Sequence, residues 1–288
     1  MSNEINENNL PRLLQGDCLE RMHEIEAGSV DMILADVPYG TTQCKWDVVI
    51  PFEPMWEHIK RVVKPNGAIV MTSSQPFTSL LICSNLKMYR YNWVWDKIKG
   101  TGHLNAQKIP MKCHEDVCVF YKKTPTFNPQ KTSGHVRKTS HRRAHLQSDV
   151  YGKTTKDTFY DSTERFPRTI QRISCDTQRS ALHSTQKPVA LMEYMIKTYS
   201  NKGDTVLDFA MGSGTTGIAC KNLDRKFVGI EKDIDIFEIA HNRIGNHMVQ
   251  MNLELKPLCE CQDPRTVFNG TRNLWTCDCC GKIVNEDK

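Results

Sequence analysis

The stretch that decides the fold is "TVLDFAMGSGTTGIACKNLDRKFVGIEKD", residues 205–233. Its apolar runs at 205–210 and 226–233 have the length and composition of buried strands, and residues 215–223 between them have the pattern of a helix. A glycine-bearing turn joins the first strand to the helix. This order of strand, turn, helix and strand predicts two parallel strands joined by a helical crossover, which is the repeating unit of an α/β sheet.

The same alternation continues through most of the chain. Further strands are predicted at 30–36, 68–73, 91–97 and 115–121, and helices at 52–63, 76–86, 187–200 and 234–244, with a turn at 64–67. Periodicity is lost only between about 122 and 180, where polar residues dominate. The sequence therefore predicts an α/β fold with a mostly parallel sheet, interrupted by an insert.

The glycine turn has the features of a cofactor loop. Gly212 and Gly214 permit a tight turn and a close approach of the backbone to a ligand. The loop lacks the lysine of a phosphate-binding P-loop, which argues against nucleoside triphosphate hydrolysis. Asp208 ends the preceding strand, and Glu231 ends the next one, where an acid can bind ribose hydroxyls. Together these residues predict an adenosine-containing cofactor.

A second informative stretch is "ILADVPYG", residues 33–40. Ligands of open α/β sheets bind at the carboxyl ends of the strands, and this strand ends there on an acid. Asp36 can accept a hydrogen bond from an amino group, and the carbonyls beside Pro38 can accept another, since proline stiffens the turn. The ring of Tyr39 can stack on a flat heterocycle. The stretch predicts a pocket for the exocyclic amine of a base.

Charge is unevenly distributed along the chain. Residues 122–180 hold thirteen Lys/Arg against five Asp/Glu, a net +8, which leaves −3 for the rest out of the overall +5. A local basic excess of this kind predicts a polyanionic partner, nucleic acid above all. No apolar stretch approaches the ~18 residues of a membrane span. The polar start "MSNEINENN" lacks the pattern of a secretory signal, which predicts a cytoplasmic protein.

The cysteines predict a metal site at the C-terminal end. Five of the twelve lie within residues 259–280, and in a reducing compartment such a cluster is typical of zinc binding. The expected ligands are Cys259, Cys261, Cys277 and Cys280, which form a C-x-C and a C-x-x-C pair resembling a small zinc ribbon. Cys279 is left over. A disulfide or free thiols remain the alternative.

Four motifs resemble those of one enzyme family, the DNA methyltransferases that methylate exocyclic amino groups. "DVPYG", residues 36–40, resembles their Asp-Pro-Pro-Tyr motif, and "LDFAMGSGTTG", residues 207–217, resembles their S-adenosylmethionine loop. "HSTQKPVALMEYMI", residues 183–196, is similar to the segment before that loop. "LLQGDCLE", residues 13–20, resembles the Gly-Asp element that borders the cofactor adenine. The catalytic motif precedes the cofactor loop, which is the order of the family's β group.

The resemblance implies a Rossmann-like methyltransferase fold that binds S-adenosylmethionine. Its expected parts are a catalytic half at 10–121, a target-recognition region at 122–180, a cofactor-binding half at 181–248 and a zinc-ribbon-like tail at 256–288. The basic insert thus coincides with the region that the family uses to recognise DNA. The resemblance also implies a homodimer and a bacterial or phage protein that associates with the nucleoid.

Site residues follow from the matched motifs. The resemblance assigns catalysis to Asp36, Pro38 and Tyr39. It assigns cofactor binding to Asp17, Lys187, Asp208, Gly212, Gly214 and Glu231. Within that set, Lys187 is expected to face the methionine carboxylate, and Asp17 is expected to border the adenine.

Asp36 at the first motif position favours adenine N6 as the methylated atom, with cytosine N4 as the alternative. Cytosine C5 methylation is excluded because the chain has no Pro-Cys pair to supply the nucleophile. RNA or a protein side chain is a further candidate substrate. Val37 replaces the first proline of the motif, so a DNA-binding protein with an inactive methyltransferase core also stays open.

Overall fold

A computed structural model describes residues 10–42, 44, 46–144, 147–148, 152–153, 155–175, 186–254, 266–269, 274–277 and 283–285. The chain forms two compact units, residues 1–241 and 242–288. The first unit contains the sheet and every motif named above outside the cysteine cluster.

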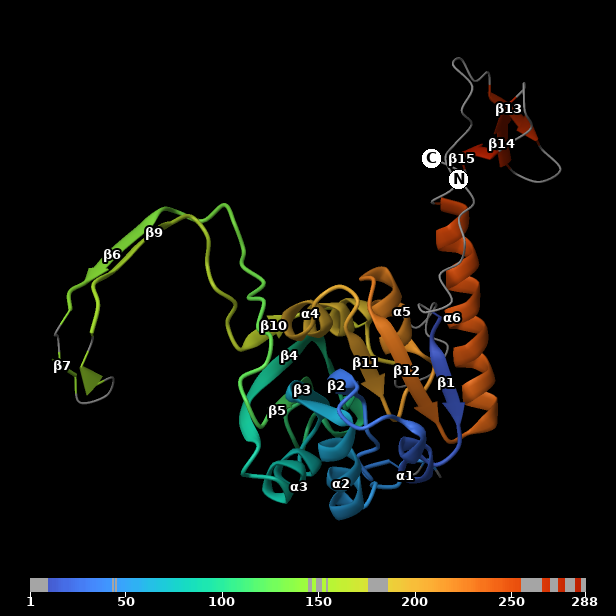
Figure 1. Ribbon diagram of the computed structural model, residues 1–288, viewed down its shortest axis with the longest axis horizontal. Helices are drawn as coiled ribbons and strands as arrows, with labels where there is room; N and C mark the ends of the chain where they lie inside the picture. Colours follow the sequence, from blue (N-terminus) through green and yellow to red (C-terminus); the bar gives the residue numbers. More distant parts are fainter. Residues whose placement is uncertain are drawn as a thin grey trace. The chain divides into compact units, whose positions relative to one another are not determined.

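Eight of the described strands of the first unit form one mixed sheet (Figure 1). In sheet order they are β1 (Arg12–Gln15), β12 (Lys226–Glu231), β11 (Thr205–Asp208), β2 (Val30–Ala35), β3 (Val63–Ser73), β5 (Lys112–Phe120), β4 (Tyr89–Thr101) and β10 (Ile170–Arg172). Neighbouring strands run parallel except at β5, which is antiparallel to both β3 and β4. The prediction of an α/β fold with a mostly parallel sheet is confirmed.

Helices cover both faces of the sheet (Figure 1). One face carries α1 (Cys18–Arg21), the 3₁₀ helix η2 (Met22–Glu24), α2 (Phe52–Val62) and α3 (Phe77–Ser84), and the other carries α4 (Val189–Tyr199) and α5 (Thr215–Asn222). A second 3₁₀ helix, η3 (His103–Asn105), lies between β4 and β5, and α6 (Ile234–Glu254) follows β12. In this three-layer arrangement the crevice beyond the carboxyl ends of the strands is the expected place for a ligand.

The core forms because the apolar residues recur with the period of each element. On α2, Met55, Trp56, Ile59 and Val62 lie on one face and are all buried against the sheet. Each such side chain contributes roughly 1.5–3 kcal/mol through the apolar surface it removes from water. The indole of Trp56 also donates a hydrogen bond to Ser84 Oγ at 2.8 Å, which joins α2 to α3.

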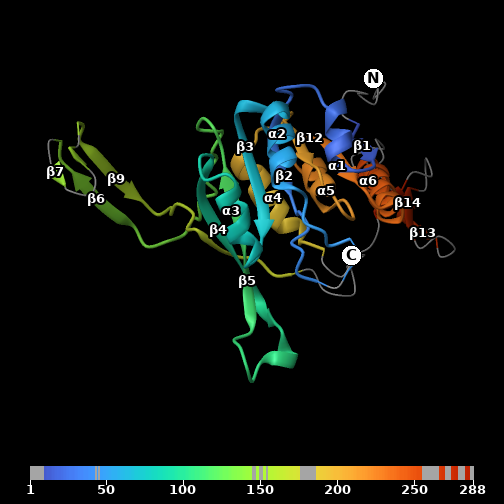
Figure 2. The ribbon, with the colours of Figure 1, turned by 90° about the horizontal axis from the view of Figure 1, so that it is seen from below.

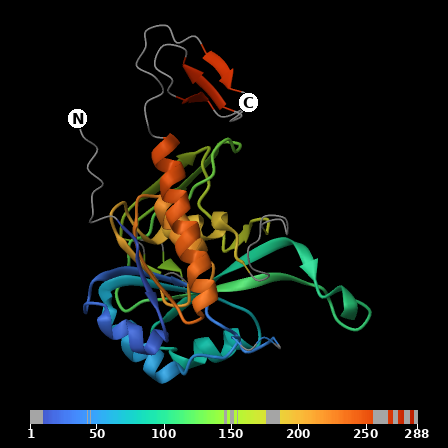
Figure 3. The same cartoon turned by 90° about the vertical axis from the view of Figure 1, so that its right-hand side faces the viewer.

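Four strands outside the basic insert differ from the sequence prediction. The predicted turn at 64–67 is wrong, because β3 starts at Val63, which pairs with Val30 before the register shifts. The strands predicted at 91–97 and 115–121 are longer, since β4 and β5 continue past their neighbours as a hairpin (Figures 2 and 3). The four-residue β1 was not predicted, since so short a run has no clear period.

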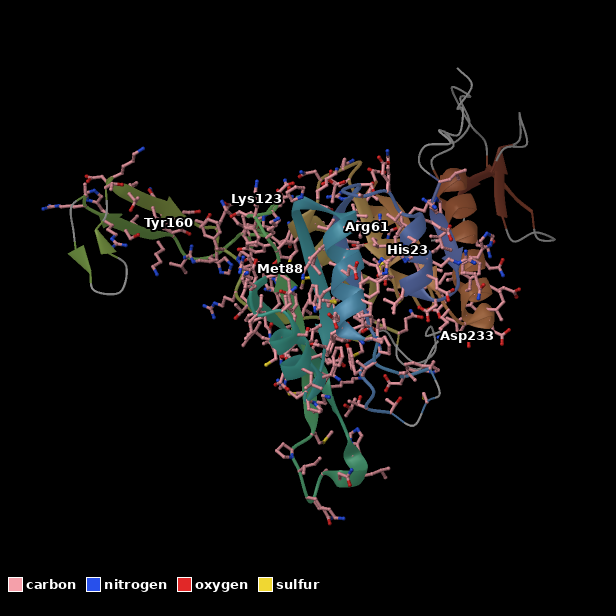
Figure 4. All side chains as sticks on the ribbon, turned by 60° about the horizontal axis from the view of Figure 1, so that its bottom comes forward. His23, Arg61, Met88, Lys123, Tyr160 and Asp233 are labelled. Carbon is pink, nitrogen blue, oxygen red and sulfur yellow. The ribbon has the colours of Figure 1, made fainter. Side chains whose placement is uncertain are left out.

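The basic insert contains short strands that its polar composition conceals. β6 (Lys138–Arg142) and β9 (Thr158–Ser162) form a two-stranded antiparallel ribbon, and Figure 4 labels Tyr160 on β9. β7 (Gln147–Ser148) pairs with β8 (Gly152–Lys153), and β10 joins the main sheet beside β4. A strand with polar residues on both faces shows no alternation of apolar and polar residues, so the sequence did not predict these short strands.

The second unit contains a small antiparallel sheet. Its strands are β13 (Thr266–Asn269), β14 (Leu274–Cys277) and β15 (Ile283–Asn285), in that order. Of the predicted zinc ligands, Cys277 is the last residue of β14, and Cys259, Cys261 and Cys280 lie outside the described residues. Within the described ranges, no group of three His, Cys, Asp or Glu is arranged to hold a metal ion. The helices in those ranges also include none that could cross a membrane.

Candidate active site

The site lies at the carboxyl ends of the parallel strands. β2, β11 and β12 are neighbours in the sheet, so Asp36, Asp208 and Glu231 emerge at the same edge. β1 pairs in parallel with β12 and brings Asp17 to this edge as well. The sequence predicted Asp36, Asp208 and Glu231 at strand ends, and the structure places these three acids along one edge, whereas Asp17 was expected there only from the family resemblance.

Asp36 accepts hydrogen bonds at both carboxylate oxygens. Its Oδ1 accepts from the hydroxyl of Tyr39 at 2.9 Å and from the hydroxyl of Thr72, near the end of β3. Its Oδ2 accepts from Lys187 Nζ at 2.9 Å. The side chain keeps 27% of its surface exposed, so the carboxylate is positioned by protein donors yet is open on one side.

Tyr39 is held by its hydroxyl and by one face of its ring. The hydroxyl, which lies 3.0 Å from Thr72 Oγ1, donates to Asp36. The ring stacks on Phe77 with 5.3 Å between centroids and 25° between planes. Burial, together with the negative charge of Asp36, raises the pKa of Tyr39 well above its usual value. The phenol therefore stays neutral and continues to donate its proton at physiological pH.

Lys187 joins two carboxylates. Its ammonium lies 2.9 Å from Asp36 Oδ2 and 3.4 Å from Glu115 Oε2, and the side chain is only 10% exposed. Burial alone would lower the pKa of Lys187, but the negative charges of Asp36 and Glu115 outweigh it and raise the pKa well above the usual value. The other oxygen of Glu115 accepts from the buried Lys97 at 3.1 Å. Lys187 was expected at the cofactor carboxylate, and the structure shows it bound to Asp36.

The turn after Asp36 is well supported despite its departure from the family pattern. Val37, at the position of the first proline, is 4% exposed and packs in the main core. Beyond Tyr39, the carboxylate of Asp47 accepts the backbone N–H groups of Gly40, Thr41 and Thr42 at 2.7–2.9 Å. Burial works against ionisation of Asp47, but these hydrogen bonds prevail and lower its pKa.

Asp208 organises the glycine loop from beneath. It is fully buried, accepts the hydroxyl of Thr216 at 2.6 Å and accepts the amide of Ala210 at 3.1 Å. Burial raises the pKa of Asp208 to about 7, although the two hydrogen bonds oppose that shift. Since one bond runs to the turn after β11 and the other to the first turn of α5, this acid shapes the loop rather than presenting an oxygen to the crevice.

Glu231 and the glycines form a cradle that fits an adenosine. One oxygen of Glu231 accepts the amide of Gly212 at 2.9 Å and the other accepts that of Asp233 at 2.9 Å. Each oxygen retains a second acceptor position that a ribose hydroxyl can use. Gly212 and Gly214 have φ values of +51° and +83°, and a Cβ at Gly212 would meet no atom within 4 Å. The loop thus leaves open space beside its backbone.

Asp17 closes the cradle on the side of β1. Its Oδ1 accepts the amide of Leu19 at 2.9 Å and begins α1, and its Oδ2 lies 3.0 Å from Lys232 Nζ. Burial works against ionisation, but the bonds to Lys232 and Leu19 lower the pKa of Asp17. The acid therefore ties β1 to the residue that follows Glu231.

Sequence reasoning missed several residues of this site. Gln186 Oε1 accepts from Ser213 Oγ at 3.4 Å, so Gln186 touches the glycine loop while the adjacent Lys187 touches Asp36. Thr72 stands near the end of a predicted strand, and the strand-end rule was a sufficient signal to find it. Glu115 gave no such signal, because it lies near the start of a strand whose antiparallel direction is not evident from sequence.

A sheet edge that joins an Asp-x-Pro-Tyr turn to a glycine cradle defines a class of base methyltransferases. The chain belongs to the DNA methylase family, the group of N6 and N4 amino methyltransferases, which it matches over residues 30–242. It is 30% identical to the type II methyltransferase M.HpaI of Haemophilus parainfluenzae over 256 residues, 82% of this chain and 74% of that one.

Two further relatives are similar over most of their length. The DNA adenine methyltransferase YhdJ of Escherichia coli (strain K12) is 29% identical over 255 residues, 82% of this chain and 83% of that one. Among solved structures, the M1.HpyAVI–SAM complex superposes with a TM-score of 0.56 at 25% identity, and the match covers 81% of this chain and 100% of the other. The methyltransferase fold expected from the motifs is therefore confirmed for the first unit.

Proposed function

We propose that this DNA methyltransferase transfers a methyl group from S-adenosylmethionine to the N6 amino group of adenine. The observation that carries the proposal is the Asp36 carboxylate, held by protein donors at the sheet edge that also bears the glycine cradle. An acid at the first motif position supports adenine, as does the similarity to YhdJ, which is named a DNA adenine methyltransferase.

The residues that would hold the cofactor are those of the cradle. Glu231 would take the ribose hydroxyls, Gly212 and Gly214 would allow close approach, Asp208 would keep the turn in shape and Asp17 would border the adenine. The M1.HpyAVI–SAM structure, similar in fold and 25% identical, supports this cofactor. When bound, S-adenosylmethionine supplies a methyl group on a positively charged sulfur, which keeps the electron pair of the carbon–sulfur bond when that bond breaks.

Asp36 would make the amino group nucleophilic. The lone pair of N6 is delocalised into the adenine ring. Hydrogen bonds from its two N–H groups to Asp36 and to a carbonyl beside Pro38 would localise that pair toward the methyl group. The nitrogen would then form the new N–C bond, and one proton would leave N6 along the hydrogen bond to Asp36. Positioning and fixed dipoles of this kind supply most of the rate in such sites.

The target base would have to leave the helix stack to reach Asp36. Tyr39 would receive it by stacking, because Phe77 supports one face of the ring, and the Lys187 ammonium that lies over the ring would give way to the base. The predicted stacking role of Tyr39 is thus kept, with Phe77 as the second layer of an aromatic support.

Residues 122–180 would recognise the DNA sequence. A two-stranded ribbon fits the major groove of DNA, and β6 and β9 form such a ribbon. Alternation along β6 puts Lys138, Ser140 and Arg142 on one face, which supports contacts to phosphates or base edges. Lys138→Gln should raise the KM for DNA about threefold and leave kcat unchanged. Lys202→Gln, an exposed lysine paired with Asp224, is the matched control.

The cysteine-rich tail would bind zinc through the four predicted thiolates, and a disulfide is the rival. In support, β14 ends at Cys277, and Cys280 follows it in the sequence at the C-x-x-C spacing of a zinc knuckle. Elemental analysis of protein purified without chelator should give one zinc per chain, reduced by Cys277→Ser. Zinc-free protein with oxidised tail cysteines would overturn the proposal.

The proposed function includes an oligomeric state and a cellular location. A homodimer is proposed on the family resemblance alone, and sedimentation at several protein concentrations tests it. A species of one chain at all concentrations would contradict it. The cytoplasm of a bacterial or phage-infected cell, where the DNA substrate is accessible, is the proposed location.

The deciding experiment is methyl transfer from labelled S-adenosylmethionine to unmethylated DNA, followed by digestion and base-resolved mass spectrometry. We expect N6-methyladenine with the parent protein and none with Asp36→Ala. Detection of N4-methylcytosine instead would support the same mechanism but contradict adenine as the methylated base. Bound DNA and bound cofactor without any transfer would overturn the enzymatic proposal and favour a binding protein with an inactive core.

A further inference from the structure

Asp36 has no carboxylate oxygen left without a donor. Oδ1 accepts from Tyr39 and Thr72, and Oδ2 accepts from the ammonium of Lys187. Oδ2 keeps a second acceptor position, but the ammonium that bonds it also lies over the Tyr39 ring, 5.4 Å from its centroid, where the base would stack, so the ammonium has to move aside when the base enters. Tyr39 and Thr72 belong to packed elements, whereas Lys187 reaches Asp36 at the end of a long side chain.

Glu115 offers Lys187 a second place. Its Oε1 accepts from Lys97 at 3.1 Å, which fixes the carboxylate at the start of β5. Its Oε2 is buried and receives no hydrogen bond, and Lys187 Nζ lies 3.4 Å away. A buried oxygen without a donor is costly, so this atom gains when the ammonium moves toward it.

The exchange leaves the buried charge unchanged. Two lysines and two carboxylates, Lys97, Lys187, Glu115 and Asp36, form one neutral set, and a shift of Lys187 within it leaves the net charge of the set at zero. The ammonium also lies over the Tyr39 ring, 5.4 Å from its centroid. Its departure would therefore clear space beside the ring on which the base stacks.

We propose that Glu115 is a positioning residue that takes Lys187 from Asp36 when the target base enters, with Lys97 holding Glu115 in place. The inference rests on the proposed function, since it is the exocyclic amino group that displaces Lys187. Before the base enters, Lys187 keeps Asp36 oriented and neutralised. Once Lys187 has moved, Oδ2 of Asp36 is free to accept the N–H of the base.

A double-mutant cycle on kcat tests the transfer of the ammonium. Glu115→Gln keeps the shape and a bond to Lys97 but no longer attracts Lys187, so kcat should fall about tenfold, equivalent to ~1.4 kcal/mol, with KM for S-adenosylmethionine unchanged. In a Lys187→Met background the same change should cost less than about twofold. Glu115→Asp should restore part of the rate. Glu193→Gln, in the surface pair with Lys197, is the matched control and should leave kcat unchanged.

Equal losses from Glu115→Gln in both backgrounds would show a merely structural role and overturn the proposal. A second cycle needs no turnover and uses urea unfolding of the free protein. Lys187→Met should show coupling in stability with Glu115→Gln as well as with Asp36→Asn, and absence of the Glu115 coupling would contradict the shared position. If the parent protein methylates no DNA yet shows both couplings, the proposed function is overturned, while the sharing of Lys187 between Asp36 and Glu115 is upheld.

Discussion

Two acids end neighbouring parallel strands, and they differ in almost every physical respect. Asp208 at the end of β11 is fully buried, and its two hydrogen bonds come from the turn and the start of the helix that directly follow it. Asp36, directly after β2, is partly exposed and accepts from three side chains, two of them on other elements. The same place in the sheet thus carries one acid that builds a turn and one that is presented to a ligand.

The difference shows what a strand-end acid needs in order to act on a substrate. Asp208 is occupied and out of reach of solvent, and burial raises its pKa to about 7. Asp36 has external donors, one of which, Lys187, has another carboxylate within 3.4 Å. We therefore expect changes at Asp208 to act first on stability and the loop, and changes around Asp36 to act on the transfer rate.

The largest expected effect concerns Asp208 and pH. Its pKa in the folded protein, about 7, lies above the usual 3.8, so the folded state holds a proton that the unfolded state releases between these values. The parent should accordingly lose stability as pH rises from about 4 to 7, by roughly a few kcal/mol. Asp208→Asn cannot ionise, so its free energy of unfolding should lack that loss.

Urea unfolding of both proteins at several pH values measures this difference. Asp224→Asn, which alters an exposed acid paired with Lys202, is the matched control and should follow the parent curve. Parallel curves for Asp208→Asn and the parent would contradict the contrast, because they would mean that Asp208 is as readily ionised as a surface acid.

An intermediate effect is expected at Thr72. Thr72→Val keeps the shape and removes one donor from Asp36, so the carboxylate is held less firmly. The loss of one such bond, ~1 kcal/mol, should lower kcat about fivefold. Thr78→Val, a buried threonine that bonds Ser73 and Asp116, is the control. Thr78→Val should lower stability with little effect on kcat. A fall in kcat for Thr78→Val with no fall for Thr72→Val would contradict the comparison.

The smallest effect is expected at Val37. The side chain packs in the core, and the family motif has proline there, which is similar in volume. Val37→Pro should change stability by about 1 kcal/mol and kcat by less than about threefold. Steady-state methylation by the variant measures this, and a gain of tenfold or more would mean that Val37 impairs the parent enzyme.

The sequence predicted the parts of the site that parallel strands deliver. Asp36, Asp208 and Glu231 each end an apolar run, and the carboxyl ends of such runs meet at one edge. The positive φ values of Gly212 and Gly214 likewise agree with the predicted tight turn. These features depend on local pattern, which a single sequence contains.

Other parts depend on direction and pairing, which the sequence does not contain. Glu115 enters the site because β5 runs antiparallel. Lys187 bonds Asp36 through a contact between residues that lie 151 positions apart in the sequence. The turn predicted at 64–67 instead lies in β3, because pairing of Val63 with Val30 outweighed the local preference of Pro and Gly. Tertiary contacts decided each of these outcomes.

The most direct test of the contrast compares Asp36→Asn and Asp208→Asn in one pair of assays, calorimetric binding of S-adenosylmethionine and single-turnover methyl transfer to DNA. Asp36→Asn should bind the cofactor like the parent and lose transfer by on the order of a thousandfold. Asp208→Asn should weaken cofactor binding or stability and keep a measurable transfer rate once saturated. Near-parent transfer by Asp36→Asn would contradict the account, whatever Asp208→Asn does.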